Sequence, residues 1–92
     1  MKVKILKSPN YSAKIRKSHK IKFIIIHYTG MQSEDESVER LIDEKSKVSA
    51  HYLINKKGQV VKMVDDNKIA WHAGKSRWKN FINLNSQSIG IE

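Results

Sequence analysis

The sequence has 92 residues, 39% of them apolar, which allows one small domain, because a chain of this size buries only about 60–65% of its unfolded surface. It contains no cysteine, so disulfides and thiolate ligands are excluded, and no apolar run approaches the roughly 20 residues that cross a membrane. Its 18 Lys and Arg residues and 9 Asp and Glu residues give a net charge of +9, which favours polyanionic neighbours such as nucleic acid, anionic lipid or an anionic cell wall.

The distribution of the basic residues argues against nucleic acid as the partner. They are spread along the chain, without the interleaved aromatic residues of a surface that stacks on bases. The first twenty residues are basic but lack the apolar core of a secretory signal, which predicts a cytoplasmic location for the chain as given. A periplasmic or cell-wall-associated location stays open if a signal has been removed.

Two strands are predicted in the N-terminal third. Residues 3–6 form a short apolar strand, residues 8–10 a turn around a proline, and residues 11–20 a polar loop. Residues 23–26, Phe-Ile-Ile-Ile, are a continuous aromatic and β-branched run, which predicts a central strand covered on both faces. Gly30 ends the segment that follows this strand.

One helix is predicted near residues 34–44. Ser33 and Glu36 have the spacing of a capping box at its start. The apolar residues that follow have the i, i+3, i+4 spacing of one helical face: Val38, Leu41 and Ile42.

A β-hairpin is predicted downstream of the helix. Its strands are residues 48–54 and 59–64, joined by an Asn-Lys-Lys-Gly turn whose glycine suits positive φ. Alternation in the first strand places His51 and Leu53 on the face opposite to Ala50.

Residues 65–87 are predicted to be irregular, with Trp71, Trp78 and Phe81 as aromatic anchors. Residues 88–92 begin another buried strand, which stops at a charged residue. Strands before and after a helix, with a hairpin between them, predict an α/β domain with a mixed β-sheet and flanking helices.

Two histidines are candidate functional groups. His27 directly follows the 23–26 strand, and the open end of an α/β sheet usually carries the site, so His27 is a candidate ligand or general base. The alternative is a core histidine whose ring nitrogens are satisfied by backbone groups. For His51 we favour a structural role, in which a hydrogen-bonded ring orients a loop, over metal ligation.

Three residues nearer the C-terminus are further candidates. Trp71 and His72 lie among small residues in an irregular segment, where backbone and rings can approach a bound molecule. The alternative is a tryptophan at the core edge beside a solvated histidine. Glu92 follows an apolar strand and is costly to bury unless it is paired, protonated or near a metal, so it is either a general base or a strand end that reaches solvent.

Four sequence blocks follow one another along the chain: Ile25-Ile26-His27-Tyr28-Thr29-Gly30, Val48-Ser49-Ala50-His51-Tyr52-Leu53-Ile54, Ala70-Trp71-His72-Ala73-Gly74 and Ser86-Gln87-Ser88-Ile89-Gly90-Ile91-Glu92. Together they resemble the zinc-dependent N-acetylmuramoyl-L-alanine amidases, in the peptidoglycan-recognition-protein-like superfamily. The resemblance covers residues 22–92. It implies that residues 1–92 are the N-terminal portion of a single amidase domain, which is truncated at its C-terminal side.

The resemblance also implies a function. The expected protein is a hydrolase that uses zinc-activated water to cleave the amide bond between N-acetylmuramic acid and L-alanine in peptidoglycan or its fragments. His27 matches a zinc ligand of the family, and Glu92 matches its catalytic acid/base. Trp71 and His72 are expected to line the groove that receives the substrate.

The family pattern continues beyond Glu92. Its other two zinc ligands, a histidine and an aspartate or cysteine, lie farther along, as does a lysine thought to stabilise the oxyanion. The 92-residue chain alone is therefore expected to be inactive. In phage lysozyme-type amidases and peptidoglycan recognition proteins a tyrosine precedes the residue matching His51, whereas this chain has Ala50, so Tyr52 receives no catalytic role by analogy.

Two other functions stay open: a non-catalytic peptidoglycan-binding module and a basic nucleic-acid-binding domain.

His27 and Glu92 are predicted to lie at the ends of neighbouring strands and to face one cleft. The interrupted last strand, with Ile89 and Ile91, predicts exposed apolar surface or an unpaired edge and a tendency to associate, but the sequence does not set an oligomeric state.

Overall fold

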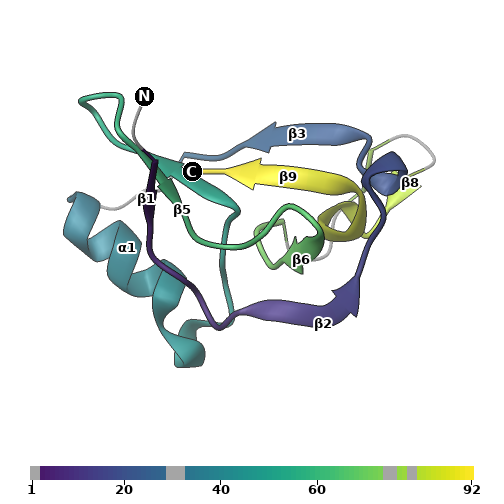
Figure 1. Cartoon of the computed structure of the whole chain (residues 1–92), viewed down its shortest axis with the longest axis horizontal. Coiled ribbons are helices and arrows are strands. Elements are labelled where there is room, and N and C mark those ends of the chain that lie inside the picture. Colours follow the sequence, from purple (N-terminus) through teal and green to yellow (C-terminus); the bar gives the residue numbers. More distant parts are fainter. Residues whose placement is uncertain (1–2, 29–32, 74–76, 79–80) are drawn as a thin grey trace.

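A five-stranded mixed β-sheet runs through the part of the chain that the structure describes, residues 3–28, 33–73, 77–78 and 81–92 (Figure 1). The computed structural model orders the strands as β1 (Val3–Ile5), β5 (Val60–Lys62), β4 (Tyr52–Ile54), β9 (Ser88–Ile91) and β3 (Phe23–Ile26). β4 and β5 are antiparallel, and the other neighbours are parallel. The predicted α/β fold with a mixed sheet is confirmed.

Helix α1 (Glu34–Ile42) begins where the capping box predicts. Ser33 Oγ accepts a hydrogen bond from the backbone N–H of Glu36 (3.2 Å), and the acidic first turn suits the positive end of the helix dipole. The helix ends two residues earlier than predicted. Asp43 takes an extended conformation there and caps a separate 3₁₀ turn, η2 (Glu44–Ser46), with its side chain.

Two buried polar residues from the N-terminal segment hold the end of α1. Ser8 Oγ donates to the carbonyl of Leu41 (2.5 Å), and Asn10 Nδ2 donates to the carbonyls of Asp43 (2.8 Å) and Val48 (2.8 Å). The last carbonyls of a helix have no intrahelical partner, so the Ser8 bond satisfies one that α1 leaves open, while the Asn10 bonds hold the chain that follows the helix. The predicted turn at residues 8–10 therefore attaches β1 to the C-terminal end of the helix.

The predicted hairpin is confirmed as β4 and β5, with strands shorter than expected. Gly58 adopts a φ of 78°, and the side-chain oxygen of Asn55 accepts two following backbone N–H groups (3.0 and 2.9 Å) to close the turn. Ala50, predicted to face away from Leu53, is fully buried in the same core cluster as Leu53. The prediction fails because β4 begins only at Tyr52, so alternation does not extend back to Ala50.

The apolar core lies between α1 and the β4–β5 hairpin. Its buried side chains are Leu41, Ala50, Leu53, Val61 and Met63. Partly buried apolar side chains pack around them: Leu6, Val38, Ile42 and Val48. All three apolar residues of the predicted helical face take part, so the helical periodicity identified the buried side of α1.

Residues 11–20, predicted to be a polar loop, contain a strand instead. β2 (Tyr11–Ile15) pairs in antiparallel fashion with β6 (Lys68–Ala70), which lies in the segment predicted to be irregular. This pairing joins segments far apart in the sequence, and local patterns do not reveal such contacts. The remaining short elements are η1 (Ser18–Lys20), β7 (Arg77–Trp78), β8 (Phe81–Ile82) and η3 (Leu84–Gln87).

The predicted aromatic anchors are only partly within the described residues. Phe81 does act as an anchor, because its ring meets the Phe23 ring edge to face at a centroid distance of 5.0 Å. Gly30 and the side chain of Trp78 lie outside the residues that the structure describes.

β3 is an edge strand of the described sheet, and the prediction of a central strand covered on both faces is wrong. Phe23 and Ile25 are half-buried, whereas Ile24 and Ile26 are 69% and 78% exposed. A continuous apolar run is also compatible with a strand that has one open face, and no described element covers this face. The exposed apolar surface or unpaired edge predicted at the last strand is not found there, because β9 is paired with β4 and β3 and its Ile89 and Ile91 are half-buried; the exposed isoleucines belong to β3 instead.

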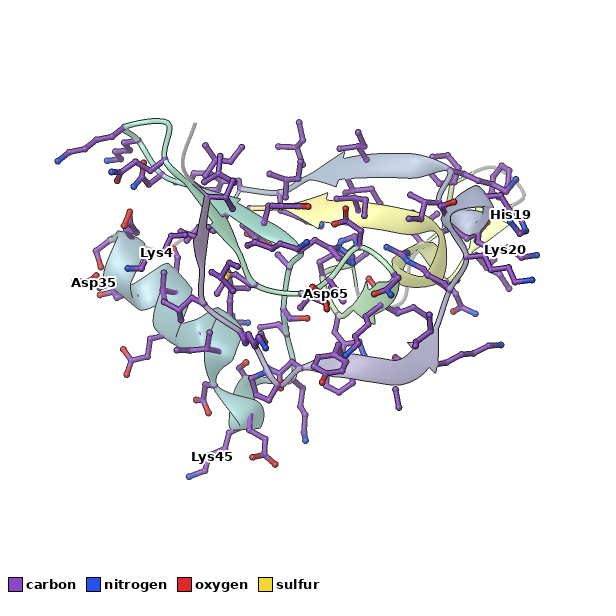
Figure 2. All side chains as sticks on the ribbon, in the orientation of Figure 1. Lys4, His19, Lys20, Asp35, Lys45 and Asp65 are labelled. Atoms are coloured by element: carbon purple, nitrogen blue, oxygen red, sulfur yellow. The ribbon has the colours of Figure 1, made fainter. Side chains whose placement is uncertain are left out.

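Among the described residues, Arg16 is the one Lys, Arg, Asp or Glu that is buried, and the other charged side chains are more exposed. Lys4 and Asp35 lie near α1, Lys45 lies at the opposite end of that helix, and His19 and Lys20 lie at the far end of the molecule (Figure 2). In the described part of the chain, no helix has the length and apolar character needed to cross a membrane.

His51 is fully buried, and both of its ring nitrogens are engaged. Nδ1 accepts the backbone N–H of Gly90 (3.1 Å), and Nε2 lies 2.8 Å from the carbonyl of Lys68, which accepts its hydrogen. These bonds require the neutral ring. Burial is the main factor that lowers the pKa of His51 below its ordinary value of 6.5, and the nearby charge of Arg16 acts in the same direction. The arrangement agrees with the predicted structural role.

We expect His51→Gln to lower the free energy of unfolding by roughly 1–3 kcal/mol at about pH 8, because Gly90 and Lys68 lose a buried partner. The difference from wild type should shrink at about pH 5.5. The lowered pKa means that the unfolded chain binds a proton before the folded one does, so the contribution of His51 is complete above 6.5 and is lost as the pH falls below it. Urea unfolding at both pH values measures this.

The matched control for this experiment is His19, which is exposed at the far end of the molecule (Figure 2). His19→Gln should leave the pH dependence of wild-type stability in place. An equal difference between wild type and His51→Gln at both pH values would contradict the assignment of a neutral, hydrogen-bonded His51.

The exposed face of β3 should support self-association at high protein concentration. Replacing Ile26 by lysine should raise the dissociation constant of that association by about tenfold or more, since burying one isoleucine is worth about 1.5–3 kcal/mol. Sedimentation equilibrium measures it. Ile15→Lys is the control, because Ile15 is 64% exposed on β2 and not on the main sheet. Equal weakening by both variants would argue against association through β3.

Candidate active site

The site begins at the paired ends of β3 and β9. The two strands are parallel, with Phe23 opposite Ser88 and Ile26 opposite Ile91, and the N–H of His27 donates to the carbonyl of Ile91 (2.8 Å). His27 therefore emerges beside Glu92. Side chains of residues that pair across a sheet point to the same face. The alternating Ser-Ile-Gly-Ile-Glu sequence thus places Ser88, Gly90 and Glu92 on the face that carries His27.

A cavity of about 310 Å³ opens at this end of the sheet. His27, His72 and Glu92 line it from the sheet side, and Ser37, Arg40 and Leu41 line it from α1. Tyr28, Val48 and Ser49 complete the lining. The predicted geometry is confirmed: His27 and Glu92 follow neighbouring strands and border one cavity. Their predicted chemical roles are not tested by this geometry.

His72 connects this cavity to the body of the sheet. Its Nδ1 lies 2.8 Å from Nε2 of His27, and its Nε2 lies 2.9 Å from Oγ of Ser88. Ser88 Oγ also donates to the carbonyl of Leu84 (2.7 Å). Two backbone N–H groups, of His72 and Ala73, donate to Oδ1 of Asn85 (3.2 and 2.8 Å), which fixes the chain at this point.

Gly90 provides the space in which the His72 ring lies. A Cβ atom at position 90 would lie 2.3 Å from Cγ of His72 and 2.4 Å from its Cδ2, far inside van der Waals contact. Only glycine therefore allows the ring to pack this closely against β9. The short Ser-Ile-Gly-Ile sequence therefore both forms β9 and leaves room for the His72 ring.

Burial and neighbouring charge keep His72 neutral. Burial lowers the pKa of His72 to about 3, and His27, His51 and Arg16 act in the same direction. Arg16 is itself buried, and its guanidinium donates to the carbonyls of Asp66 (3.1 Å) and Asn85 (3.1 Å). A neutral imidazole has one donor and one acceptor nitrogen, so His72 can accept from one neighbour and donate to another.

Glu92 is half-buried, and burial raises the pKa of its carboxyl above 4.5, against the opposing influence of His27 and Arg40. A raised pKa makes a carboxylate a better proton acceptor near neutral pH, which suits a general base. The backbone of Glu92 continues the sheet: its N–H donates to Tyr52 (2.9 Å) and its carbonyl accepts from Ile54 (3.0 Å). The carboxylate is therefore attached to a rigid strand end.

Trp71 is not among the residues that line this cavity. Its indole N–H donates to Ser12 Oγ in β2 (3.0 Å), and its backbone N–H donates to Ser49 Oγ (2.8 Å). Its predicted role in substrate binding stays a prediction. Tyr52, which received no catalytic role, donates its hydroxyl hydrogen to Asp66 (2.8 Å).

Sequence reasoning did not single out Ser88, Asn85 or Arg16. The alternation of small and apolar residues in Ser-Ile-Gly-Ile-Glu was the available signal for Ser88, whereas the partners of Asn85 and Arg16 depend on long-range packing. Within the described ranges, no group of three or more His, Asp or Glu side chains is arranged to hold a metal ion. The prediction that His27 is one zinc ligand stays a prediction.

Comparison with known proteins places this arrangement in a family. AmiD of Escherichia coli strain K12, an N-acetylmuramoyl-L-alanine amidase, is 40% identical over 80 residues, which cover 79% of this chain and 28% of AmiD. The 1,6-anhydro-N-acetylmuramyl-L-alanine amidase AmpD of Haemophilus influenzae is 32% identical over 89 residues, which cover 78% of this chain and 48% of AmpD. The chain thus spans less than half the length of either relative.

Solved structures of amidases also resemble this chain in fold. A crystal structure of a selenomethionine derivative of AmpD superposes with a TM-score of 0.77 at 26% identity, over 98% of this chain and 59% of that one. Escherichia coli AmiD in complex with anhydro-N-acetylmuramic acid-L-Ala-D-γ-Glu-L-Lys superposes with a TM-score of 0.70 at 35% identity, over 88% of this chain and 32% of that one. A family model described as N-acetylmuramoyl-L-alanine amidase matches residues 17–92. The chain therefore belongs to the N-acetylmuramoyl-L-alanine amidase family.

Proposed function

We propose that this chain forms part of an amidase that hydrolyses the bond between N-acetylmuramic acid and L-alanine in peptidoglycan or its fragments. The observation that carries the proposal is the juxtaposition of His27 and Glu92 at the ends of two paired parallel strands, on the wall of one cavity. The relatives support the substrate class, because AmiD was solved with an anhydro-muramyl peptide and AmpDh3 of Pseudomonas aeruginosa with an anhydromuramic pentapeptide.

We propose zinc as the cofactor, held by His27 and by ligands outside the described residues. His27 fits this role because one of its ring nitrogens is engaged by His72, which leaves the other for a metal. Imidazole nitrogen is a preferred zinc donor, and a catalytic zinc takes about three protein ligands and a water. When bound, the metal supplies a polarised scissile carbonyl and a water of lowered pKa.

Glu92 then carries the proton transfers. Its carboxylate accepts a proton from the water as the water oxygen bonds to the amide carbon. It delivers that proton to the nitrogen of L-alanine as the carbon–nitrogen bond breaks, so the products are a free muramic acid carboxyl group and a free peptide amine. Attachment to β9 holds the carboxylate in place for both steps.

The first test is metal binding by the full-length gene product. We expect about one zinc per chain by atomic absorption, loss of that zinc in His27→Ala, and an affinity within about tenfold of wild type in His51→Gln. Residues 1–92 alone should bind zinc weakly and show no turnover. Equal loss of zinc in the two histidine variants, or one zinc with steady turnover from residues 1–92 alone, would contradict the ligand assignment.

The second test separates binding from catalysis. Glu92→Gln keeps the shape of the side chain but removes the proton acceptor, so it should retain zinc while the rate of stem-peptide release falls by about 10²-fold to 10⁴-fold. Chromatography of an anhydro-muramyl tripeptide digest measures this rate. Glu39→Gln is the control, because Glu39 is exposed on α1 and lies outside the cavity lining. A wild-type protein that binds the muropeptide without cleaving it would instead identify a peptidoglycan-binding module.

A further inference from the structure

Three hydrogen bonds in series connect the carbonyl of Leu84 to the ring of His27. The Ser88 hydroxyl lies 2.7 Å from that carbonyl, Nε2 of His72 lies 2.9 Å from the hydroxyl oxygen, and Nδ1 of His72 lies 2.8 Å from Nε2 of His27. Each link needs one hydrogen between its two atoms. The positions of those hydrogens follow from the chemistry of the groups, starting at the carbonyl.

The carbonyl end sets the direction of the series. A carbonyl oxygen only accepts, so the hydrogen between it and Ser88 is the one that the serine hydroxyl carries. With that hydrogen used, Ser88 Oγ turns a lone pair toward His72. Nε2 of His72 must then carry the N–H, because two lone pairs at 2.9 Å would repel each other.

The hydrogen between His72 and His27 can be placed in the same way. A neutral imidazole has one N–H, and in His72 that N–H is at Nε2, so Nδ1 has a lone pair. Nε2 of His27 must therefore donate to it. In the neutral form of His27, the only ring hydrogen is then at Nε2, and Nδ1 keeps a lone pair.

We propose that His72 and Ser88 are positioning residues that fix His27 as its Nε2–H tautomer and so present Nδ1 as the atom that binds the metal. The proposal rests on the proposed function, because it names the nitrogen that would meet the zinc. Ligating histidines usually donate their second ring N–H to a fixed acceptor, which sets tautomer and orientation. Here the acceptor is a second histidine, whose own tautomer is set in turn by a serine.

The packing around His72 supports a dedicated position for this ring. Gly90 admits the ring to a place where any Cβ atom would clash, and Asn85 holds the backbone on which the ring is carried. Both ring nitrogens of His72 are used within the protein. His72 therefore acts on the reaction through His27, and its ring nitrogens are not the groups that bind the substrate.

Nitrogen-15 NMR of the metal-free 92-residue chain reads the tautomers directly. In wild type we expect a protonated, pyrrole-type Nε2 and an unprotonated, pyridine-type Nδ1 in both His27 and His72. Asparagine and leucine have nearly the same shape, but only asparagine offers an acceptor oxygen near the position of Nδ1. His72→Asn should therefore preserve the His27 tautomer, whereas His72→Leu and Ser88→Ala should give a mixture of tautomers.

Zinc affinity of the full-length gene product gives the second readout. His72→Leu should weaken zinc binding by about 10-fold to 100-fold, and His72→Asn should restore most of that loss. Thermal unfolding of each variant checks that the fold is retained. If His72→Leu fails to fold, Ser88→Ala takes its place, because it removes one hydroxyl group and leaves both rings.

The outcomes separate this proposal from the proposed function. Wild type with the expected tautomers but no zinc would support the hydrogen-bond series and overturn the zinc assignment. Zinc binding with His27 protonated at Nδ1 in the metal-free chain, or an unchanged His27 tautomer in both His72→Leu and Ser88→Ala, would overturn the positioning role and leave the proposed function standing. Equal zinc loss in His72→Asn and His72→Leu would also overturn it.

Discussion

The parallel pairing of β3 with β9 is the constraint on which the site depends. Its register puts residue 27 beside residue 92, so both side chains leave the sheet on one face and border one cavity. A shift of one residue would turn His27 to the face that carries Ile24 and Ile26. The hydrogen bond from the His27 N–H to Ile91 and the bonds between Glu92 and β4 extend the pairing past the strand ends. The candidate catalytic pair is thus part of the sheet and not of a free loop.

Two histidines lie against β9, His51 fully buried and His72 half-buried, and they have different roles. His51 joins β9 to β6 through Gly90 and Lys68, so it contributes to the fold. His72 instead spans the space between β9 and His27, so it contributes to the site. The neutral state of both rings follows from burial and from the charge of Arg16 nearby. One buried arginine therefore influences both the core and the cavity.

Much of the fold could be predicted from local sequence. The Ser33 cap, the apolar face of α1, the hairpin with Gly58, and the strand ends at His27 and Glu92 all express patterns within about ten residues. β2 was missed because Tyr11–Ile15 has a weak pattern and becomes a strand only by pairing with Lys68–Ala70. β3 was assigned to the centre of the sheet because a run of isoleucines does not reveal which face is covered.

The same distinction applies to the site. His27 and Glu92 could be named from their positions after apolar runs and from the family resemblance, but the link between His72 and His27 could not. That link depends on the absence of a side chain at Gly90 and on the position of Ser88 two residues earlier, which have meaning only once β9 lies against the 70–73 segment. The sequence named His27, His72 and Glu92 as candidates, and three-dimensional packing showed the contact between His72 and His27.

The central claim is that His27 and Glu92 share one metal-dependent site in which His27 binds through Nδ1. The most direct measurement is a crystal structure of the full-length gene product with zinc, in which anomalous scattering locates the metal. We expect zinc at about 2.0–2.1 Å from Nδ1 of His27, with Nε2 of that ring still bonded to His72 and the Glu92 carboxylate facing the metal-bound water. Zinc bound to His51 or His72, or bound to His27 through Nε2, would contradict it.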